Sequence, residues 1–150
     1  MVNFNSNLPE DLRRKLEAKM NSPEGAFSKA FTGIRCFDNV RTVLRALQEA
    51  GGVKATASGN FNRKFVASMI DPLLDAEEKE KLHSYHKVLN EPDLWPLHEA
   101  RIVATAAGLL IKRKGILNVT KKHLNLLDDA AAGQLFVRLF DAFFRKYNIG

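Results

Sequence analysis

The chain has 150 residues, of which 45% are hydrophobic and 27% charged, a composition typical of a single globular domain and not of a disordered segment. Its formal net charge of +6 favours an anionic partner. Cys36 is the only cysteine, which excludes a disulfide framework and a thiolate metal cluster. The first residues lack the apolar core of a signal peptide, and no apolar run approaches membrane-spanning length. We therefore expect a cytoplasmic protein that does not enter a membrane.

The N-terminal part of the chain predicts two helices. The first runs from Pro9 to about Met20, with proline at a first-turn position. Residues 26–37 are apolar but match no single type of element. Asp38 is a suitable N-cap for a second helix, whose apolar residues recur at helical spacing until Gly51 and Gly52 end it.

A short strand, a turn and another helix follow. Residues 53–56 have room for a very short strand, and residues 58–60 form a turn and a cap. Phe61 to Met69 supplies the apolar stripe of the next helix, and Pro72 is expected to stop it.

Residues 75–93 form an acidic insert, in which six acids and three lysines give a net charge of −3. It predicts a helix from Glu77 to about Val88 with a solvated surface. His83 and His86, three residues apart on this helix, could share a metal ion, but no third ligand follows at a characteristic spacing. Surface histidines are the preferred interpretation, and no metal or cofactor is predicted.

The segment 94–108 predicts the helix that would correspond to a recognition helix. At 100° per residue, His98, Arg101, Thr105 and Gly108 share one face. The expected opposite, apolar side comprises Trp95, Glu99, Ile102, Val103, Ala106 and Leu110. One arginine and one histidine make a poor reader of base edges, so a core-packing helix is the preferred interpretation and base contacts the alternative.

A basic β-hairpin comes next. Residues 109–112 and 116–119 are short apolar-rich runs on either side of a turn at residues 113–115, and Thr120 could cap a helix through Leu127. Between positions 112 and 123 there are five cations and no acid: Lys112, Arg113, Lys114, Lys121 and Lys122. Arg63 and Lys64 join this set, because cations in the first turn of a helix are unfavourable unless an anion lies nearby. Phosphate binding and an ordinary solvated surface both explain these residues.

The C-terminal helix, from about Ala130 to Tyr147, is apolar over more than half of its circumference. Either it lies deep in its own core, or it also packs against a second copy as a homodimer. No pattern indicates an enzyme. Cys36 could be a buried apolar residue as well as a nucleophile. Asp128 and Asp129 are adjacent in the sequence, so their carboxylates do not face each other on a helix.

The order helix, strand, helix, helix, strand, strand predicts a mainly α protein of the winged helix-turn-helix class. It would have a three-helix core, a small hairpin wing and additional N- and C-terminal helices. We expect a single domain comprising an N-terminal appendage (1–37), a core (38–127) that carries the insert, and a C-terminal helix (128–150).

Two motifs carry a resemblance to a known family. Residues 52–61 (GVKATASGNF) and 107–122 (AGLLIKRKGILNVTKK) resemble elements of uncharacterised bacterial proteins related to a plasmid open reading frame and to transposon passenger proteins. The resemblance spans roughly Asp38 to Tyr147 and implies a winged-helix-like region, without an activity. His123 departs from the pattern, which carries glycine there and would permit a different turn.

The sequence therefore predicts a non-enzymatic protein that binds double-stranded DNA through phosphate contacts from a basic wing. The alternative is a protein-interaction or dimerisation module with the same fold and no nucleic-acid role.

Overall fold

The computed structural model describes residues 24–146, with side chains from residue 35 to 145. The predicted helix at residues 9–20 and the last residue of the predicted C-terminal helix, Tyr147, lie outside this part. The described elements are α2 (Glu24–Ala50), β1 (Val53–Lys54), α3 (Arg63–Leu73), α4 (Ala76–Tyr85), α5 (Trp95–Ala106), β2 (Leu110–Arg113), β3 (Ile116–Val119) and α6 (Ala132–Lys146). Three 3₁₀ segments complete them: η1 (Glu91–Asp93), η2 (Lys121–Leu127) and η3 (Asp129–Ala131).

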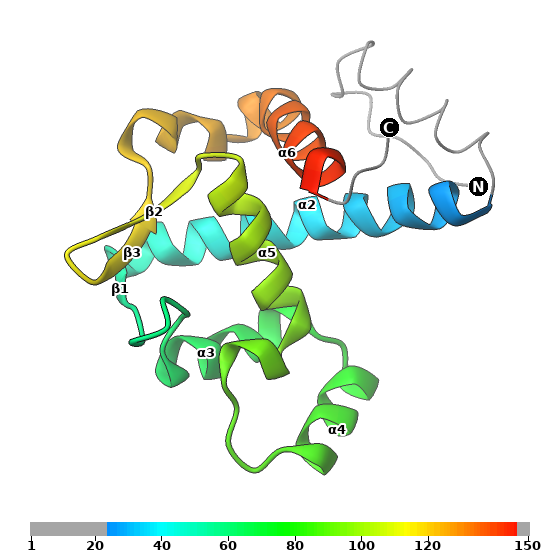
Figure 1. Ribbon diagram of the computed structural model, residues 1–150, viewed down its shortest axis with the longest axis vertical. Helices are drawn as coiled ribbons and strands as arrows, with labels where there is room; N and C mark the ends of the chain where they lie inside the picture. Colours follow the sequence, from blue (N-terminus) through cyan, green and yellow to red (C-terminus); the bar gives the residue numbers. More distant parts are fainter. Residues whose placement is uncertain (1–23, 147–150) are drawn as a thin grey trace.

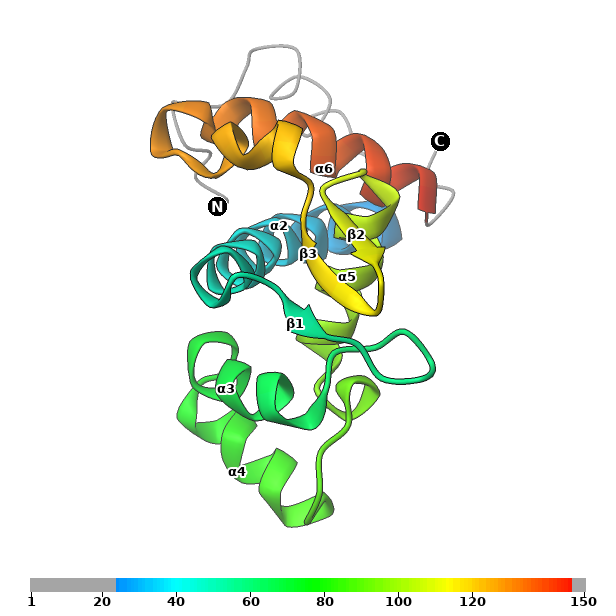
Figure 2. The same cartoon turned by 90° about the vertical axis from the view of Figure 1, so that its left-hand side faces the viewer.

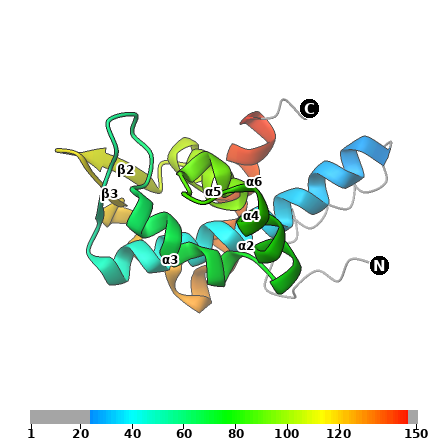
Figure 3. The ribbon, with the colours of Figure 1, turned by 90° about the horizontal axis from the view of Figure 1, so that it is seen from below.

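The protein is mainly helical, with one small antiparallel sheet (Figure 1). Helices α2 and α5 cross in the middle and contact each other, α6 lies on one side of them, and α3 and α4 lie on the other (Figures 1 and 2). Helices α3 and α5 both contact α2, and Figure 3 shows the three helices from below. The ring of Phe37 on α2 meets Phe136 and Phe143 of α6, with ring centroids 6.1 and 5.8 Å apart. A single hydrophobic core therefore joins the helices.

Helix α2 corrects the prediction that a helix begins at Asp38. The helix begins at Glu24, and Asp38 lies inside it, where its backbone oxygen accepts a hydrogen bond from the Thr42 hydroxyl. The reason is that the buried stripe continues on both sides of Asp38, through Cys36, Phe37, Val40, Val43, Leu44 and Leu47. The expected boundary between residues 37 and 38 falls within this helix. Its predicted end is confirmed: Gly51 and Gly52 follow it with φ of 71° and 99°.

Helix α3 begins later and ends later than predicted. The turn at residues 58–60 is present, but the N-cap is Asn62, whose side chain accepts from the Phe65 N–H at 2.9 Å. Pro72 lies inside the last turn and does not stop the helix before it. A proline there removes only one hydrogen bond, while the Leu74 N–H still reaches the Ile70 carbonyl. Helix α4 spans 76–85 instead of 77–88 and begins with a capping box between Asp75 and Glu78.

The three strands pair in the order β1–β3–β2, all antiparallel. The predicted hairpin is confirmed, with its pairing one residue further along: Arg113 faces Ile116, so the loop is the two residues Lys114 and Gly115. Their φ values of 52° and 78° match a type I′ turn. β1 adds to the other edge of β3, where Lys54 faces Ile116.

The segment after the hairpin differs from the predicted helix capped by Thr120. Residues 121–127 form the 3₁₀ segment η2, and the Thr120 side chain makes no cap. Its hydroxyl instead donates to the Gly108 carbonyl at 2.9 Å, which ties the end of β3 to the turn before β2.

Candidate nucleic-acid interface

The pleat of the sheet divides its side chains between two faces. Residues paired directly across the strands share a face. The inner face carries Val53, Leu110, Lys112, Leu117 and Val119, and the apolar members are buried or half-buried against the core. We call the other side the outer face; it carries Lys54, Ile111, Arg113, Ile116 and Asn118. The hairpin alternation thus produces one solvent-facing surface that is both cationic and apolar.

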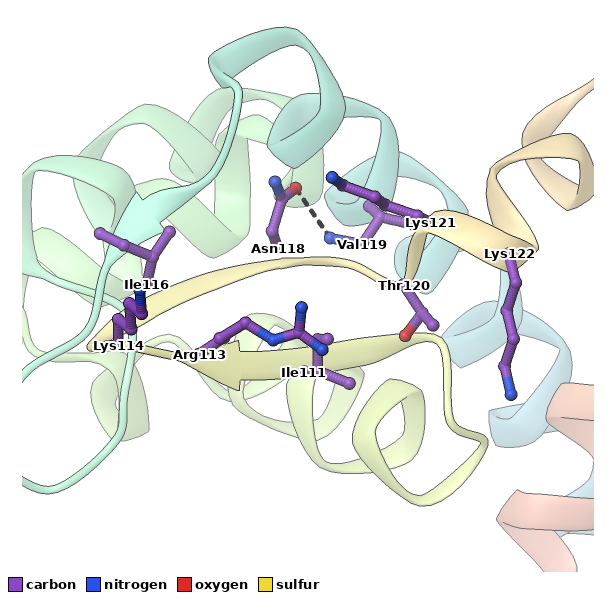
Figure 4. A pocket seen from close by; sticks show the side chains of 9 residues that line it. All are labelled: Ile111, Arg113, Lys114, Ile116, Asn118, Val119, Thr120, Lys121 and Lys122. Carbon is purple, nitrogen blue, oxygen red and sulfur yellow. Dashed lines mark hydrogen bonds between the residues drawn. The ribbon is translucent and has the colours of Figure 1, made fainter.

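A groove of about 660 Å³ lies along this outer face and continues toward η2 (Figure 4). Four of the predicted cations line it: Arg113, Lys114, Lys121 and Lys122. Ile111 and Ile116 also line it, with 36% and 40% of their surfaces exposed. The groove therefore has both cationic and exposed aliphatic side chains.

The charges of the groove are not neutralised by the protein. Within the described side chains, none of its four cations, nor Lys54, forms an ion pair with a carboxylate. The acidic insert pairs elsewhere: Glu78 with Arg35 at 2.9 Å, and Glu77 with Lys81 at 3.7 Å within α4. The hairpin keeps its positive charge available for an external anion.

Three predicted cations lie outside the groove. Lys112 belongs to the inner-face register, and its Nζ lies 3.7 Å from the position that a Gly59 side chain would occupy. Arg63 and Lys64 are exposed in the first turn of α3, where the Arg63 Nε–H donates to the Asn90 side chain at 2.9 Å. The structure thus brings together four of the predicted cations and separates these three from them.

The two candidates for base contact, His98 and Arg101, meet at a buried carboxylate. Glu91 has a fully buried side chain, and the Arg101 Nε–H donates to both of its oxygens at 2.7 and 2.8 Å. His98 Nδ1 lies 2.5 Å from one of these oxygens, and the Phe61 N–H donates to the other at 2.8 Å. Arg101 also reaches the Asn60 side chain at 2.9 Å. These side chains bind η1, α5 and the loop before α3 to one another.

The sequence did not predict the positions of two residues, one in the buried cluster around Arg101 and one on the outer face of the sheet. Glu91 was assigned to a solvated acidic face, which is wrong for this residue, because its buried carboxylate forms an ion pair with Arg101 and lies within hydrogen-bond distance of His98. The available signal was the pair His98 and Arg101, one turn apart on a helix preceded by an acid. Lys54 was also missed, although strand alternation places it on the same face as Ile116.

Helix α5 is turned relative to its predicted phase. Trp95, expected on the buried side, is 55% exposed, and Ala106 is exposed as well. The buried side consists of Leu97, Glu99, Ala100, Val103 and Ala104. The interpretation as a core-packing helix agrees with this burial, since Ala100 and Ala104 are buried in the core.

The other residues considered for catalysis or metal binding are buried, paired with neighbouring side chains or exposed on α4. The Cys36 thiol is buried beside Glu99, and desolvation, then the Glu99 charge, raises the pKa of that thiol. Asp129 forms ion pairs with Arg41 and Arg45, and a hydrogen bond from Arg45 is the first cause that lowers its pKa. His83 is exposed on α4, while His86 lies at its end, 3.7 Å from Asp93. Among the described residues no group of three metal-ligating side chains gathers.

The C-terminal helix buries most of its apolar side chains. Leu135, Leu139, Phe140, Phe143 and Phe144 are buried, and Val137, at 37% exposure, is the large apolar side chain left most open on this helix. In the described part of the chain, no helix combines the length and the apolar character needed to span a membrane.

Comparison with known proteins identifies a family to which most of the chain, including the hairpin, is similar. The model of the Y4jL N-terminal domain matches residues 34–132, which include the central helices, the sheet and the groove. The chain belongs to the Y4jL N-terminal domain family. The predicted resemblance is confirmed to this extent, and the link to transposon passenger proteins stays a prediction.

One curated member of this family is the uncharacterized protein y4jL of Sinorhizobium fredii (strain NBRC 101917 / NGR234). It is 36% identical over 103 residues, which cover 68% of this chain. The chain spans less than half of that Y4jL relative, 44% of its length. No solved structure matches the chain.

Proposed function

We propose that this chain is a winged-helix protein that binds double-stranded DNA through phosphate contacts from the groove on its outer face. The order of elements supports the fold: α2, β1, α3, α5 and the β2–β3 hairpin follow the winged-helix sequence, with α4 as an insert. The pairing of β1 with β3 supports it further, because this strand joins the first helix to the wing.

The observation that carries the proposal is the set of unneutralised cations around one groove. Arg113, Lys114, Lys121 and Lys122 come from the end of β2, the hairpin turn and the 3₁₀ segment η2, yet line a single exposed surface. Like charges so close together repel one another in the free protein, and an anion with several closely spaced charges relieves this repulsion. The phosphates of a nucleic-acid backbone are such an anion.

The backbone of Lys114 supports the same function. Lys114 is the one described residue other than glycine with a positive φ, 52°. A lysine in this conformation costs more than the asparagine or glycine that such turns prefer. A cation kept there despite that cost is explained by a role at the tip of the wing.

The proposed contact carries little sequence information. Arg101 and His98 are held by Glu91, and the remaining exposed residues of α5 include Trp95, Thr105 and Ala106, which offer few donors to base edges. Base contacts by His98 and Arg101 stay predictions on which this proposal does not depend. Affinity for DNA should then depend strongly on salt and weakly on sequence.

The experiment is a binding titration with duplex DNA at several salt concentrations. Each lost phosphate contact should lower the slope of log K against log salt concentration by about 0.9. We expect Arg113→Ala and the double variant Lys121→Ala/Lys122→Ala to lower it, with the double variant lowering it by about 1.8. Lys81→Ala is the matched control, because it removes the same charge from the acidic insert. Equal slopes in all four proteins would overturn the proposal.

The alternative is a protein-interaction module without a nucleic-acid role. The observation that favours it is the exposure of Tyr85, Val88 and Trp95, at 82%, 56% and 55%, around the end of α4 and the start of α5. A homodimer through α6 stays a prediction, although the burial of its phenylalanines favours packing within one core. Sedimentation at several protein concentrations, with Trp95→Ser and Val137→Ser compared, distinguishes these surfaces.

A further inference from the structure

The groove contains a feature that phosphate binding alone does not require. Ile111, near Arg113, and Ile116, at the turn end beside Lys114, are exposed side chains that line the cationic groove (Figure 4). Their partners across the strands are Asn118 and Arg113, so the two isoleucines are diagonal neighbours on the same face. Polar residues would be expected at exposed positions of a hairpin whose function is only to present charge.

A nucleic-acid backbone alternates charged phosphates with less polar sugars. Arg113, Lys121 and Lys122 line the same groove as the two isoleucines, so a backbone whose phosphates meet these cations would bring its sugars against exposed aliphatic side chains. The surface of a deoxyribose at C2′ is apolar, whereas a ribose carries a hydroxyl there that needs a hydrogen-bond partner.

We propose that Ile111 and Ile116 make the groove selective for deoxyribose over ribose, an inference that rests on the proposed DNA binding. The groove offers few acceptors for the proton of a 2′-hydroxyl, because its lysines and arginine only donate hydrogen bonds. The Asn118 side-chain oxygen accepts from the Val119 N–H at 2.8 Å, and the Thr120 hydroxyl donates to the Gly108 carbonyl. A 2′-hydroxyl pressed against the isoleucines would lose the water that accepts its proton without gaining an equivalent acceptor.

The test compares three duplexes of one sequence: DNA, RNA, and RNA in which each 2′-hydroxyl is replaced by fluorine. The last retains the A-form geometry of RNA but cannot donate a hydrogen bond. We expect DNA to bind about tenfold or more tightly than RNA, from the cost of one buried unpaired hydroxyl. The fluorinated duplex should bind nearly as well as DNA. Equal weakness of both A-form duplexes would overturn the proposal, since helix shape would then explain the preference.

The variants test the two side chains directly. In Ile111→Thr/Ile116→Thr, each threonine adds a hydroxyl that can pair with ribose, so the preference for DNA should fall to about twofold or less. Ile111→Val/Ile116→Val, which stays apolar, should keep it. Both pairs retain β-branched side chains at exposed strand positions, and circular dichroism should show unchanged folding.

The outcomes separate this inference from the function beneath it. Salt-dependent binding to DNA with no preference over RNA, or a preference unchanged by the threonine pair, would overturn the role of the isoleucines alone. Absence of salt-dependent binding to all three duplexes would remove the proposed function as well. A preference lost with the threonine pair while the salt slope stays unchanged would support both.

Discussion

Arg101 on α5 donates its Nε–H to both oxygens of Glu91, whose carboxylate is fully buried at the start of η1. This contact turns a charged residue of the acidic insert into a support for the loop that leads into α3. The same carboxylate accepts the backbone N–H of Phe61, which fixes the ring of Phe61 against Phe65, with centroids 4.6 Å apart. The positions of the polar side chains on α5 therefore depend on Glu91, which precedes this helix in the chain.

Removing the Glu91 carboxylate should destabilise the whole domain. Glu91→Ala leaves the half-buried Arg101 Nε–H and the Phe61 N–H without their acceptor, and breaking a buried pair in this way costs about 3–5 kcal/mol. Urea denaturation followed by circular dichroism measures the change in the free energy of unfolding. The matched control, exposed Glu80→Ala, should stay within about 0.5 kcal/mol of the parent. A similar small change for Glu91→Ala would show that the carboxylate contributes little.

Gly52 should tolerate no side chain, whereas its neighbour should tolerate one at moderate cost. A Cβ at Gly52 would lie 2.9 Å from Ile116 Cγ2 and 3.1 Å from Asn118 Nδ2, and φ there is 99°. At Gly51, with φ of 71°, a Cβ would meet open space. We expect Gly51→Ala to cost about 1 kcal/mol from backbone strain and Gly52→Ala about 2–3 kcal/mol from strain and crowding. Thermal unfolding of the two variants measures the difference, and equal losses would contradict it.

Lys114→Asn should separate stability from binding. Asparagine followed by glycine is the preferred pair for a type I′ turn, so the variant should have a higher free energy of unfolding, by up to about 1 kcal/mol. Urea denaturation measures this change. The same change removes one cation from the groove and should lower the salt slope of DNA binding by about 0.9. A more stable protein with an unchanged slope would place the tip of the wing outside the interface.

His123 should make the protein less stable in mild acid. Its pKa is lowered from 6.5 by burial first, and then by the charges of Arg138 and Lys122. The unfolded chain binds the proton more readily than the folded protein does. The stability that the neutral His123 contributes is therefore fully present above about pH 6.5 and is lost as the pH falls below that value. We expect the free energy of unfolding to fall from about pH 7.5 to about pH 5, and to fall less in His123→Asn. An NMR titration with a His123 pKa at or above 6.5 would refute this.

The hairpin could be predicted because its determinants are local. Gly115 supplies a positive φ at the turn, and apolar residues alternate on each side of it, so strand pairing needs no distant information. The end of α2 at Ala50, before Gly51, has the same origin. The cations of the groove followed from this hairpin and its immediate continuation into η2.

Local signals failed where tertiary contacts override them. Asp38 looks like an N-cap, but the buried stripe on both sides of it keeps the helix continuous, since burial of several apolar side chains outweighs one favourable cap. The phase of α5 was misjudged for a related reason. Trp95 is a large apolar residue, yet Leu97, Ala100, Val103 and Ala104 form the buried side of this helix, and its phase leaves the tryptophan outside.

The sequence by itself determined the hairpin, the main helices and the excess of positive charge, since each depends on residues a few positions apart. Only the tertiary structure decided which cations share a groove and which are held by a buried acid. Glu91 reaches the Phe61 N–H across 30 residues, and Arg101 reaches Asn60 across 41. Such pairs depend on how the elements pack, because burial leaves a charge with only the partners that the fold brings within hydrogen-bond distance.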